Sequence, residues 1–283
     1  MTEFAEVADR VWVARQQWYD LNVALVRGSA GLIVVDTQAS TRAARAIVDE
    51  VQALGIGEVT AIVNTHEHFD HTFGNDAFRE AYGAVPIHAH EVAADRTVEA
   101  GESIKQRFAG QTDDPHRAEV LETQVVAADH TFSSVRVLDL GDRQVELVHP
   151  GRGHTAGDAV IRVPDADVVL AGDLVEESGP PAYGADCHPL EWPGTLDVVI
   201  NLVGRDTVVV PGHGAPVGRS FVEQQRQEIA ITAQTIRDLA VVGIPPERAL
   251  REGEWPFPSE GLTHAISRGY AQLPPGGRGL PLA

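Results

Sequence analysis

The sequence predicts an α/β fold with two mixed β-sheets packed face to face and helices on both outer sides. Two observations support this prediction. Short apolar, β-branched runs typical of buried strands occur in two groups, one between residues 11 and 90 and the other between residues 134 and 210. Segments with helical periodicity accompany both groups. Two sheets that each carry helices on one side bury their remaining apolar faces against each other.

The first group begins with three strands, which we expect as an antiparallel meander at residues 11–15, 21–26 and 32–36. An amphipathic helix follows from Ser40 to Leu54, because apolar residues recur there at helical spacing and Gly55 can end the helix. The remaining elements of this group are a strand that begins at residue 59, a helix at 75–82, a strand at 85–90 and a helix at 91–108.

The second group follows a loop predicted at 111–117. Its expected strands lie at residues 134–139, 144–149, 159–163, 168–171 and 207–210. Helices are expected at 197–203 and 221–242, followed by one more helix and a loose Pro/Gly-rich tail that runs to Ala283. No repeat and no clear linker interrupts the chain, so we predict one domain over residues 1–283. Its core covers about residues 10–215, and a helical C-terminal extension covers 216–283.

Composition excludes several classes of function. The formal net charge is −19, from 41 acidic and 22 basic residues, and such a surface repels a nucleic-acid backbone. No segment has the length of a membrane span, and the first residues lack the pattern of a secretory signal. Cys187 is the single cysteine, which favours a reducing cytoplasm. We therefore expect a small-molecule substrate, no nucleic acid and no membrane; a homodimer is left open.

The chemistry gathers at the end of the strand that begins at residue 59, where the chain reads His66-Glu67-His68-Phe69-Asp70-His71. Side chains two apart in an extended segment point the same way, so His66 and His68 can hold one metal ion. Asp70 and His71 lie past the bend and face a neighbouring position. Three imidazoles and a carboxylate are costly to bury without a partner, and a divalent cation is the natural one. The alternative is a polar loop that happens to be rich in histidine.

Similar residues follow other β-type segments. His154 lies in a glycine-rich stretch, Asp173 follows Gly172, and His213 lies between Gly212 and Gly214. Asp36, at the end of the third strand, is a weaker candidate. Glycines allow the backbone to turn sharply and to approach a ligand closely. Together with the cluster after residue 65, these residues complete a set of five imidazoles and two carboxylates.

In the order of these motifs the chain resembles the metallo-β-lactamase superfamily over about residues 10–215. The resemblance implies a four-layer αβ/βα sandwich, classed as α/β and in some schemes as α+β, with metals at the edge between the two sheets. It implies that one metal is bound by His66, His68 and His154, that a second is bound by Asp70, His71 and His213, and that Asp173 bridges both. Asp36 would orient the cluster through hydrogen bonds.

The function implied is a metal-activated hydroxide attacking a carbonyl substrate: a thioester, a lactone, an ester or a β-lactam. Asp70 would be catalytic, by hydrogen-bonding the nucleophile and passing on its proton. The two divalent ions are expected to be Zn²⁺, although the same ligands accept iron or manganese. Aspartate at position 173, where the familiar β-lactamases often carry Cys or Ser, places the chain nearer the glyoxalase II and lactonase branches.

Other functions are weighed against this one. A mononuclear-iron sulfur (persulfide) dioxygenase of the same superfamily would use only His66, His68 and His154; a phosphodiesterase and a non-catalytic metal-binding module are further alternatives. In the irregular segment 176–192, Tyr183, Trp192 and His188 are weak candidates for substrate contacts, and core packing explains Tyr183 and Trp192 about as well. Glutathione thioesters are disfavoured. In the branch that cleaves them, a helical C-terminal region supplies basic residues, and here helical period leaves several of the corresponding arginines in solvent, the candidates being Arg226, Arg237, Arg248, Arg251 and Arg268.

Overall fold

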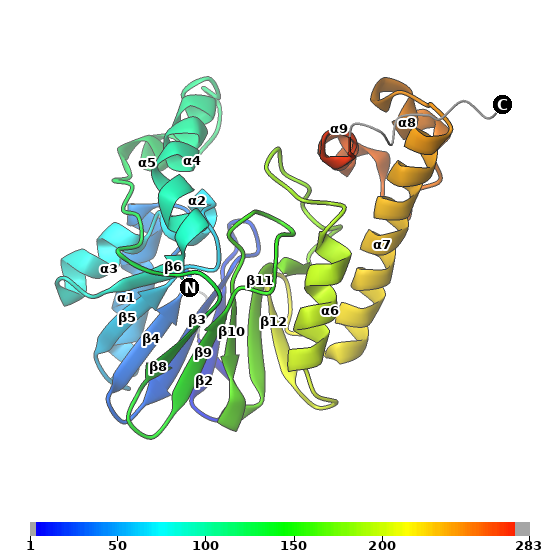
Figure 1. The fold of residues 1–283 in the computed structure, drawn as a ribbon. Coiled ribbons are helices and arrows are strands. Elements are labelled where there is room, and N and C mark those ends of the chain that lie inside the picture. The colour runs from blue at the N-terminus through cyan, green and yellow to red at the C-terminus, as the bar shows by residue number, and fades with distance from the viewer. Residues whose placement is uncertain (1–3, 275–283) are drawn as a thin grey trace.

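The structure, a computed structural model, describes residues 4–274. Two β-sheets face each other and helices cover their outer sides, as Figure 1 shows. Within the described residues, the first sheet has the order β1-β2-β3-β4-β5-β6-β7 and the second the order β12-β11-β10-β9-β8. The first consists of β1 (Ala5–Ala8), β2 (Val11–Arg15), β3 (Asn22–Gly28), β4 (Gly31–Val35), β5 (Val59–Val63), β6 (Ile87–His90) and β7 (His130–Phe132). The second consists of β8 (Val135–Asp139), β9 (Gln144–Val148), β10 (Val160–Val163), β11 (Val168–Glu176) and β12 (Val208–His213).

The helices divide between the two outer sides (Figure 1). Beside the first sheet lie α1 (Thr41–Leu54), α2 (Phe69–Thr72), α3 (Asn75–Tyr82), α4 (Glu91–Ala109) and α5 (Arg117–Glu122). Beside the second lie α6 (Trp192–Leu202), α7 (Arg219–Val241), α8 (Pro246–Glu252) and α9 (Thr263–Gln272). Ser40 caps the first turn of α1 by accepting a hydrogen bond from the Ala43 amide, and Gly55, as predicted, ends the helix in the left-handed conformation.

Three apolar layers hold the sandwich together. Alternate side chains of the two sheets meet between them; Ile33 and Val63 of the first sheet belong to the same buried cluster as Leu147 and Ile161 of the second. The opposite face of the first sheet packs on α1 and α3, and the opposite face of the second packs on α6, α7 and α9. Both sheets mix parallel and antiparallel pairs. The predicted fold class, the two mixed sheets and the outer helices are therefore confirmed.

The strand pairing fixes where the functional loops lie. β4 and β5 are parallel, so the segments that follow them emerge at the same edge of the first sheet. β11 and β12 are also parallel, and β10 runs antiparallel to β11, so the end of β12 and the loop before β10 lie at one edge of the second sheet. These two edges face each other across the sandwich, which brings together loops that are far apart in the sequence.

Several elements differ from the prediction. The short strands β1 and β7 and the short helices α2 and α5 were not predicted, because segments of three to six residues carry too little periodicity. β11 continues beyond residue 171 to Glu176, through a glycine and an aspartate that hide its strand pattern. α6 begins at Trp192 and not at 197, because a proline occupies its first turn. Most of the predicted loose tail lies outside the described residues. Within those residues, no helix combines the length and apolar character needed to cross a bilayer.

Candidate metal centre

Seven side chains from both sheet edges converge at one point between the sheets. His66 and His68 follow β5, while Asp70 and His71 lie in α2, directly after them. His154 comes from the loop between β9 and β10, Asp173 from β11 and His213 from the end of β12. The convergence joins positions almost 150 residues apart, and the structure thus brings together all seven residues that the sequence predicts as ligands.

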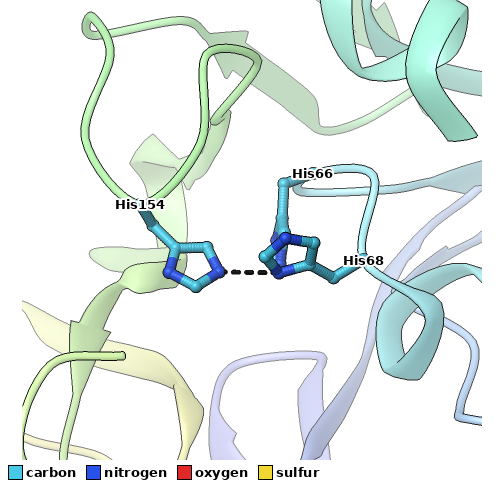
Figure 2. A group of neighbouring side chains, drawn as sticks. All are labelled: His66, His68 and His154. Carbon is cyan, nitrogen blue, oxygen red and sulfur yellow. Dashed lines mark hydrogen bonds between the residues drawn. The ribbon is translucent and has the colours of Figure 1, made fainter. Parts of the chain in front are cut away.

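The first group consists of His66, His68 and His154, whose ring nitrogens lie within 4.8 Å of one another. Figure 2 shows His66 and His68 on one side and His154 reaching toward them from the opposite loop. Nε2 of His154 lies 2.8 Å from Nδ1 of His68, and the ring of His66 lies 4.7 Å from each of the other two rings. Three imidazole nitrogens that converge in this way are a donor set that suits a divalent metal ion.

The second group consists of Asp70, His71 and His213, again with ligand atoms within 4.8 Å of one another. Nε2 of His213 lies 3.4 Å from Asp70 Oδ2 and 3.3 Å from His71 Nε2. Asp173 lies between the groups: its Oδ2 is 3.4 Å from His154 Nε2 and 3.3 Å from His213 Nε2, and its Oδ1 is 3.2 Å from His71 Nε2. This carboxylate therefore faces both groups at once.

A hydrogen bond on the far side of each imidazole fixes its orientation. Nδ1–H of His71 donates to Asp36 at 2.8 Å, while His154 and His213 donate through Nδ1–H to the carbonyls of Ala182 and Tyr19. Such partners fix the tautomer, so that the other nitrogen keeps its lone pair toward the centre. His68 and His66 follow the same rule with different partners.

His68 is the one imidazole of the cluster that presents Nδ1 to the centre. Its Nε2–H donates to Asp186 Oδ2 at 2.9 Å. His66 donates from Nδ1 to the hydroxyl of Thr65 at 3.0 Å, and that hydroxyl donates to Asp36 Oδ2 at 2.8 Å. Asp36 thus orients one imidazole of each group, His71 directly and His66 through Thr65, which is the indirect role that the sequence predicts for it.

The electrostatics are those of a cluster built for cations. Burial alone lowers the pKa of His213, but the carboxylates of Asp173 and Asp70 outweigh this and raise it to about 10. Burial also lowers the pKa of His68, but the hydrogen bond and the charge of Asp186 outweigh burial and raise this pKa to about 9. Burial tends to raise the pKa of Asp173, but the surrounding histidines, led by His213 and His71, hold it well below its usual range. Protons on His68 and His213 supply positive charge that a bound metal ion would supply in their place.

A separate observation also indicates that these donors would bind divalent metal ions. Nε2 of His66 and Oδ1 of Asp173 are buried and, within the described residues, have no hydrogen-bond partner. Buried polar atoms without partners are costly, and both residues belong to a group, His66, His71 and Asp173, whose ligand atoms lie within 4.8 Å of one another. Imidazole nitrogens with carboxylate oxygens are ligands that zinc accepts, and iron or manganese as well.

Close backbone approach is part of the geometry. A Cβ atom at Gly212 would lie 1.8 Å from Asp173 Oδ1, so only glycine leaves room for that carboxylate beside the end of β12. Gly172 has a φ of 52°, and a Cβ atom there would lie 2.8 Å from the Cβ of Thr65. The glycines beside Asp173 and His213 in the sequence thus serve the packing around the carboxylate.

Comparison with known proteins agrees with this geometry. The family model of the metallo-β-lactamase superfamily matches residues 18–214, which is more than half of the chain. The chain belongs to the metallo-β-lactamase superfamily.

Two curated relatives and one solved structure illustrate the similarity. A metallo-β-lactamase type 2 from Bacillus cereus is 26% identical over 218 residues, covering 74% of this chain and 75% of that protein. The human acyl-coenzyme A thioesterase MBLAC2 is 26% identical over 225 residues, covering 73% and 79%. A metallo-β-lactamase from Pontibacter korlensis superimposes with a TM-score of 0.64 at 21% identity, covering 81% of this chain and 99% of that one. The last similarity concerns the fold.

Two residues of this superfamily member's site were not predicted. Asp186, which holds His68, lies in the irregular segment after β11, and nothing in its neighbourhood marks it as part of the site. Glu176, the last residue of β11, has a carboxylate oxygen within 4.8 Å of ligand atoms of Asp173 and His213. Burial, with the nearby charge of Asp173, raises the pKa of Glu176 to about 7. No local pattern marked it, because β11 is buried along its whole length.

A cavity of about 770 Å³ opens in front of the metal centre. Its inner wall includes His68, Asp70, His154, Asp173 and His213. Of the three weakly predicted substrate contacts, Tyr183 lines the cavity. Trp192 and His188 do not belong to its lining. Trp192 is fully buried beneath the site and donates its indole N–H to the Leu174 carbonyl, and buried His188 lies beside Gln272.

Proposed function

We propose that the protein is a dinuclear-metal hydrolase of carbonyl substrates, with a thioester, lactone, ester or β-lactam as the substrate class. The observation that carries this proposal is the convergence of two three-residue groups on one shared carboxylate, Asp173, at the floor of a cavity. The names of the curated relatives, a β-lactamase and an acyl-coenzyme A thioesterase, support an acyl group as the part of the substrate that reacts.

The residues divide the work as follows. His66, His68 and His154 would hold one ion, Asp70, His71 and His213 the other, and Asp173 would contact both. Divalent ions held there would lower the pKa of coordinated water and would polarise the substrate carbonyl.

Asp70 is placed to handle the proton. Its side chain is 13% exposed, lines the cavity and lies 3.4 Å from His213. A carboxylate at this position can accept a hydrogen bond from the attacking water and hold its proton until the leaving group departs. The chain needs no serine or cysteine nucleophile for this reaction, and its one cysteine, Cys187, is fully buried.

The second group favours this function over the dioxygenase. A mononuclear-iron enzyme would need only His66, His68 and His154, and it would give no reason for a second set of converging ligands around His71. Iron as the bound metal, together with oxygen uptake on a persulfide, would decide for the dioxygenase.

The test begins with the metal content of the purified protein. We expect about two divalent ions per chain, turnover of at least one acyl substrate in a panel of thioesters, lactones, esters and nitrocefin, and loss of that turnover on chelation. Asp70→Ala and His154→Ala should each lower kcat/KM by at least 100-fold, whereas His130→Ala, which removes a half-exposed histidine of β7, should not. Full activity in the Asp70 or His154 variant would refute the proposal.

A further inference from the structure

The outer wall of the cavity is built partly by residues beyond the end of the family match. The inner wall carries the metal centre, whereas the outer wall is formed by the segment 178–184 and by residues 257–264, which lie between α8 and the start of α9. The family model ends at residue 214. Residues 257–264 thus lie outside the matched region, whereas 178–184 lie inside it, and the chemistry of both segments bears on which substrate enters.

This outer wall is mainly apolar. Pro180, Pro181, Tyr183, Phe257 and Leu262 all line it. The ring centroids of Tyr183 and Phe257 lie 6.4 Å apart and join the two segments, and fully buried Leu262 belongs to the same apolar cluster. Such a wall removes apolar groups of a ligand from water, which is worth about 0.8 kcal/mol for each buried methylene.

In the part of the chain that the structure describes, the same wall offers no lysine or arginine side chain to an anionic ligand. Among the described residues that line the cavity there is no lysine and no arginine. Two acidic residues, Glu176 and Glu260, line the cavity as well. His264 also lines it, and this histidine lies apart from the metal centre. Positive charge from bound metal ions would act at the inner wall and would leave the outer wall as it is.

The C-terminal arginines are engaged elsewhere. Arg226 pairs with Asp197, and Arg248 pairs with Glu252. Arg237 donates to the Leu190 carbonyl, and Arg268 donates to the Cys187 carbonyl. Arg251 lies beside Glu252. None of the five lines the cavity. The C-terminal arginines that could recognise a carboxylate or a peptide therefore pair with surface acids or with backbone carbonyls.

We infer that the outer wall, residues 178–184 with 257–264, selects substrates whose acyl group is uncharged and apolar. This inference rests on the proposed hydrolase function and assigns its substrate class. An acyl chain that ends in a methyl group is buried against Phe257 and its neighbours. An acyl chain that ends in a carboxylate loses its hydration there and meets no cation.

The experiment compares binding of two matched amides to the zinc-loaded protein by calorimetry. The probes are the 4-nitroanilides of hexanoic acid and of adipic acid, which share a six-carbon chain and differ in a terminal methyl or carboxylate. We expect the hexanoyl probe to bind at least tenfold more tightly. Equal binding, or tighter binding of the adipoyl probe, would overturn the inference. The corresponding 4-nitrophenyl esters report turnover separately, so a protein that binds with this preference but cleaves nothing would refute the proposed function alone.

Two variants locate the selection. Thr263→Arg places a cation on the outer wall and should improve binding of the adipoyl probe relative to the hexanoyl probe at least fivefold. Ser267→Arg adds the same charge to an exposed position of the same helix outside the cavity, and it should leave the ratio unchanged. An equal change in both variants would show that net charge and not the wall sets the preference, which contradicts the inference.

Chain length gives an independent measure. In the ester series from butanoyl to hexanoyl, two more buried methylenes should raise kcat/KM about 15-fold, or about fourfold each. Phe257→Ala should reduce this gain and leave the zinc content unchanged, because the residue lies away from the metal ligands. A gain that is the same in wild type and variant would overturn the assignment of the wall.

Discussion

Asp36 provides the sharpest test of how the metal centre is held. Its carboxylate accepts three hydrogen bonds, from the amide and the hydroxyl of Thr65 and from Nδ1–H of His71, each at 2.8 Å. In Asp36→Asn, the amide oxygen can replace one carboxylate oxygen. The new NH₂ group must then face two donors, Nδ1–H of His71 and the Thr65 hydroxyl, and because NH₂ cannot accept, both donors lose their partner.

The consequence for metal binding can be estimated. If His71 changes tautomer, its proton moves to Nε2 and occupies the position that a metal ion needs. His66 loses its orientation at the same time, because it is held through Thr65. Loss of such an outer partner typically lowers metal affinity 10- to 100-fold, or about 1.4–2.7 kcal/mol. Because Asp36 supports one imidazole of each group, we expect both ions to bind more weakly.

The assay is competition for zinc against a chromophoric chelator, with the two dissociation constants fitted separately. Asp197→Asn is the matched control, since it removes an aspartate that pairs with Arg226 at the surface far from the centre. Circular dichroism should show the same folded state for all three proteins. If Asp36→Asn binds both zinc ions within twofold of wild type, orientation through this carboxylate does not determine affinity, and the reasoning fails.

Two further predictions follow from the same cluster. Gly212→Ala should weaken zinc binding at least tenfold in the same competition assay, because the new methyl group would meet Asp173 Oδ1 at 1.8 Å, whereas Gly194→Ala, with open space around it, should bind zinc normally. Stability of the metal-free protein should fall as pH rises. Folding raises the pKa of His68 to about 9 and that of His213 to about 10, from the 6.5 of an unperturbed histidine. Their contribution is therefore fully present below pH 6.5 and is lost as pH rises through 9 and 10. The melting temperature of the metal-free protein should drop between pH 7 and pH 10 by more than that of the zinc-loaded protein, in which these imidazoles are already neutral; parallel curves would contradict this.

The seven candidate ligands could be predicted from the sequence because each lies in a recognisable local context. The run from His66 to His71 follows an apolar strand, and His213 follows another. In a sheet of this kind, side chains just after a strand lie at an edge where loops meet, so their approach could be expected before the fold was known. The types of residue then indicated the chemistry.

Apart from Asp36, the partners that orient these ligands could not be predicted in the same way. The carbonyls of Tyr19 and Ala182 accept hydrogen bonds from His213 and His154, and a backbone carbonyl has no signature in the sequence. Asp186 holds His68 across 118 positions in the chain, from a segment without periodicity. Glu176 was concealed because β11 is buried along its whole length, so its alternation could not be read. These contacts depend on tertiary packing alone.

Backbone strain concentrates where these unpredictable contacts are made. Among the described residues, those other than glycine with positive φ include Tyr19 at 61°, Asp20 at 58°, Asp36 at 58° and Gln38 at 94°, all in the loops that flank the metal centre. A residue in this region costs about 1–3 kcal/mol, and it persists only when its surroundings hold it there. Here the restraint is visible: the Tyr19 carbonyl accepts from His213, the Asp20 carbonyl accepts from the Gly214 amide, and the Asp36 carboxylate is bound three times. The loop that orients the ligand is thus itself held in place by the ligand's own segment. It follows that removal of the His213 imidazole should relax the Tyr19–Asp20 turn as well as remove a ligand, and hydrogen exchange at the Gly214 amide, measured without metal, would separate these two effects.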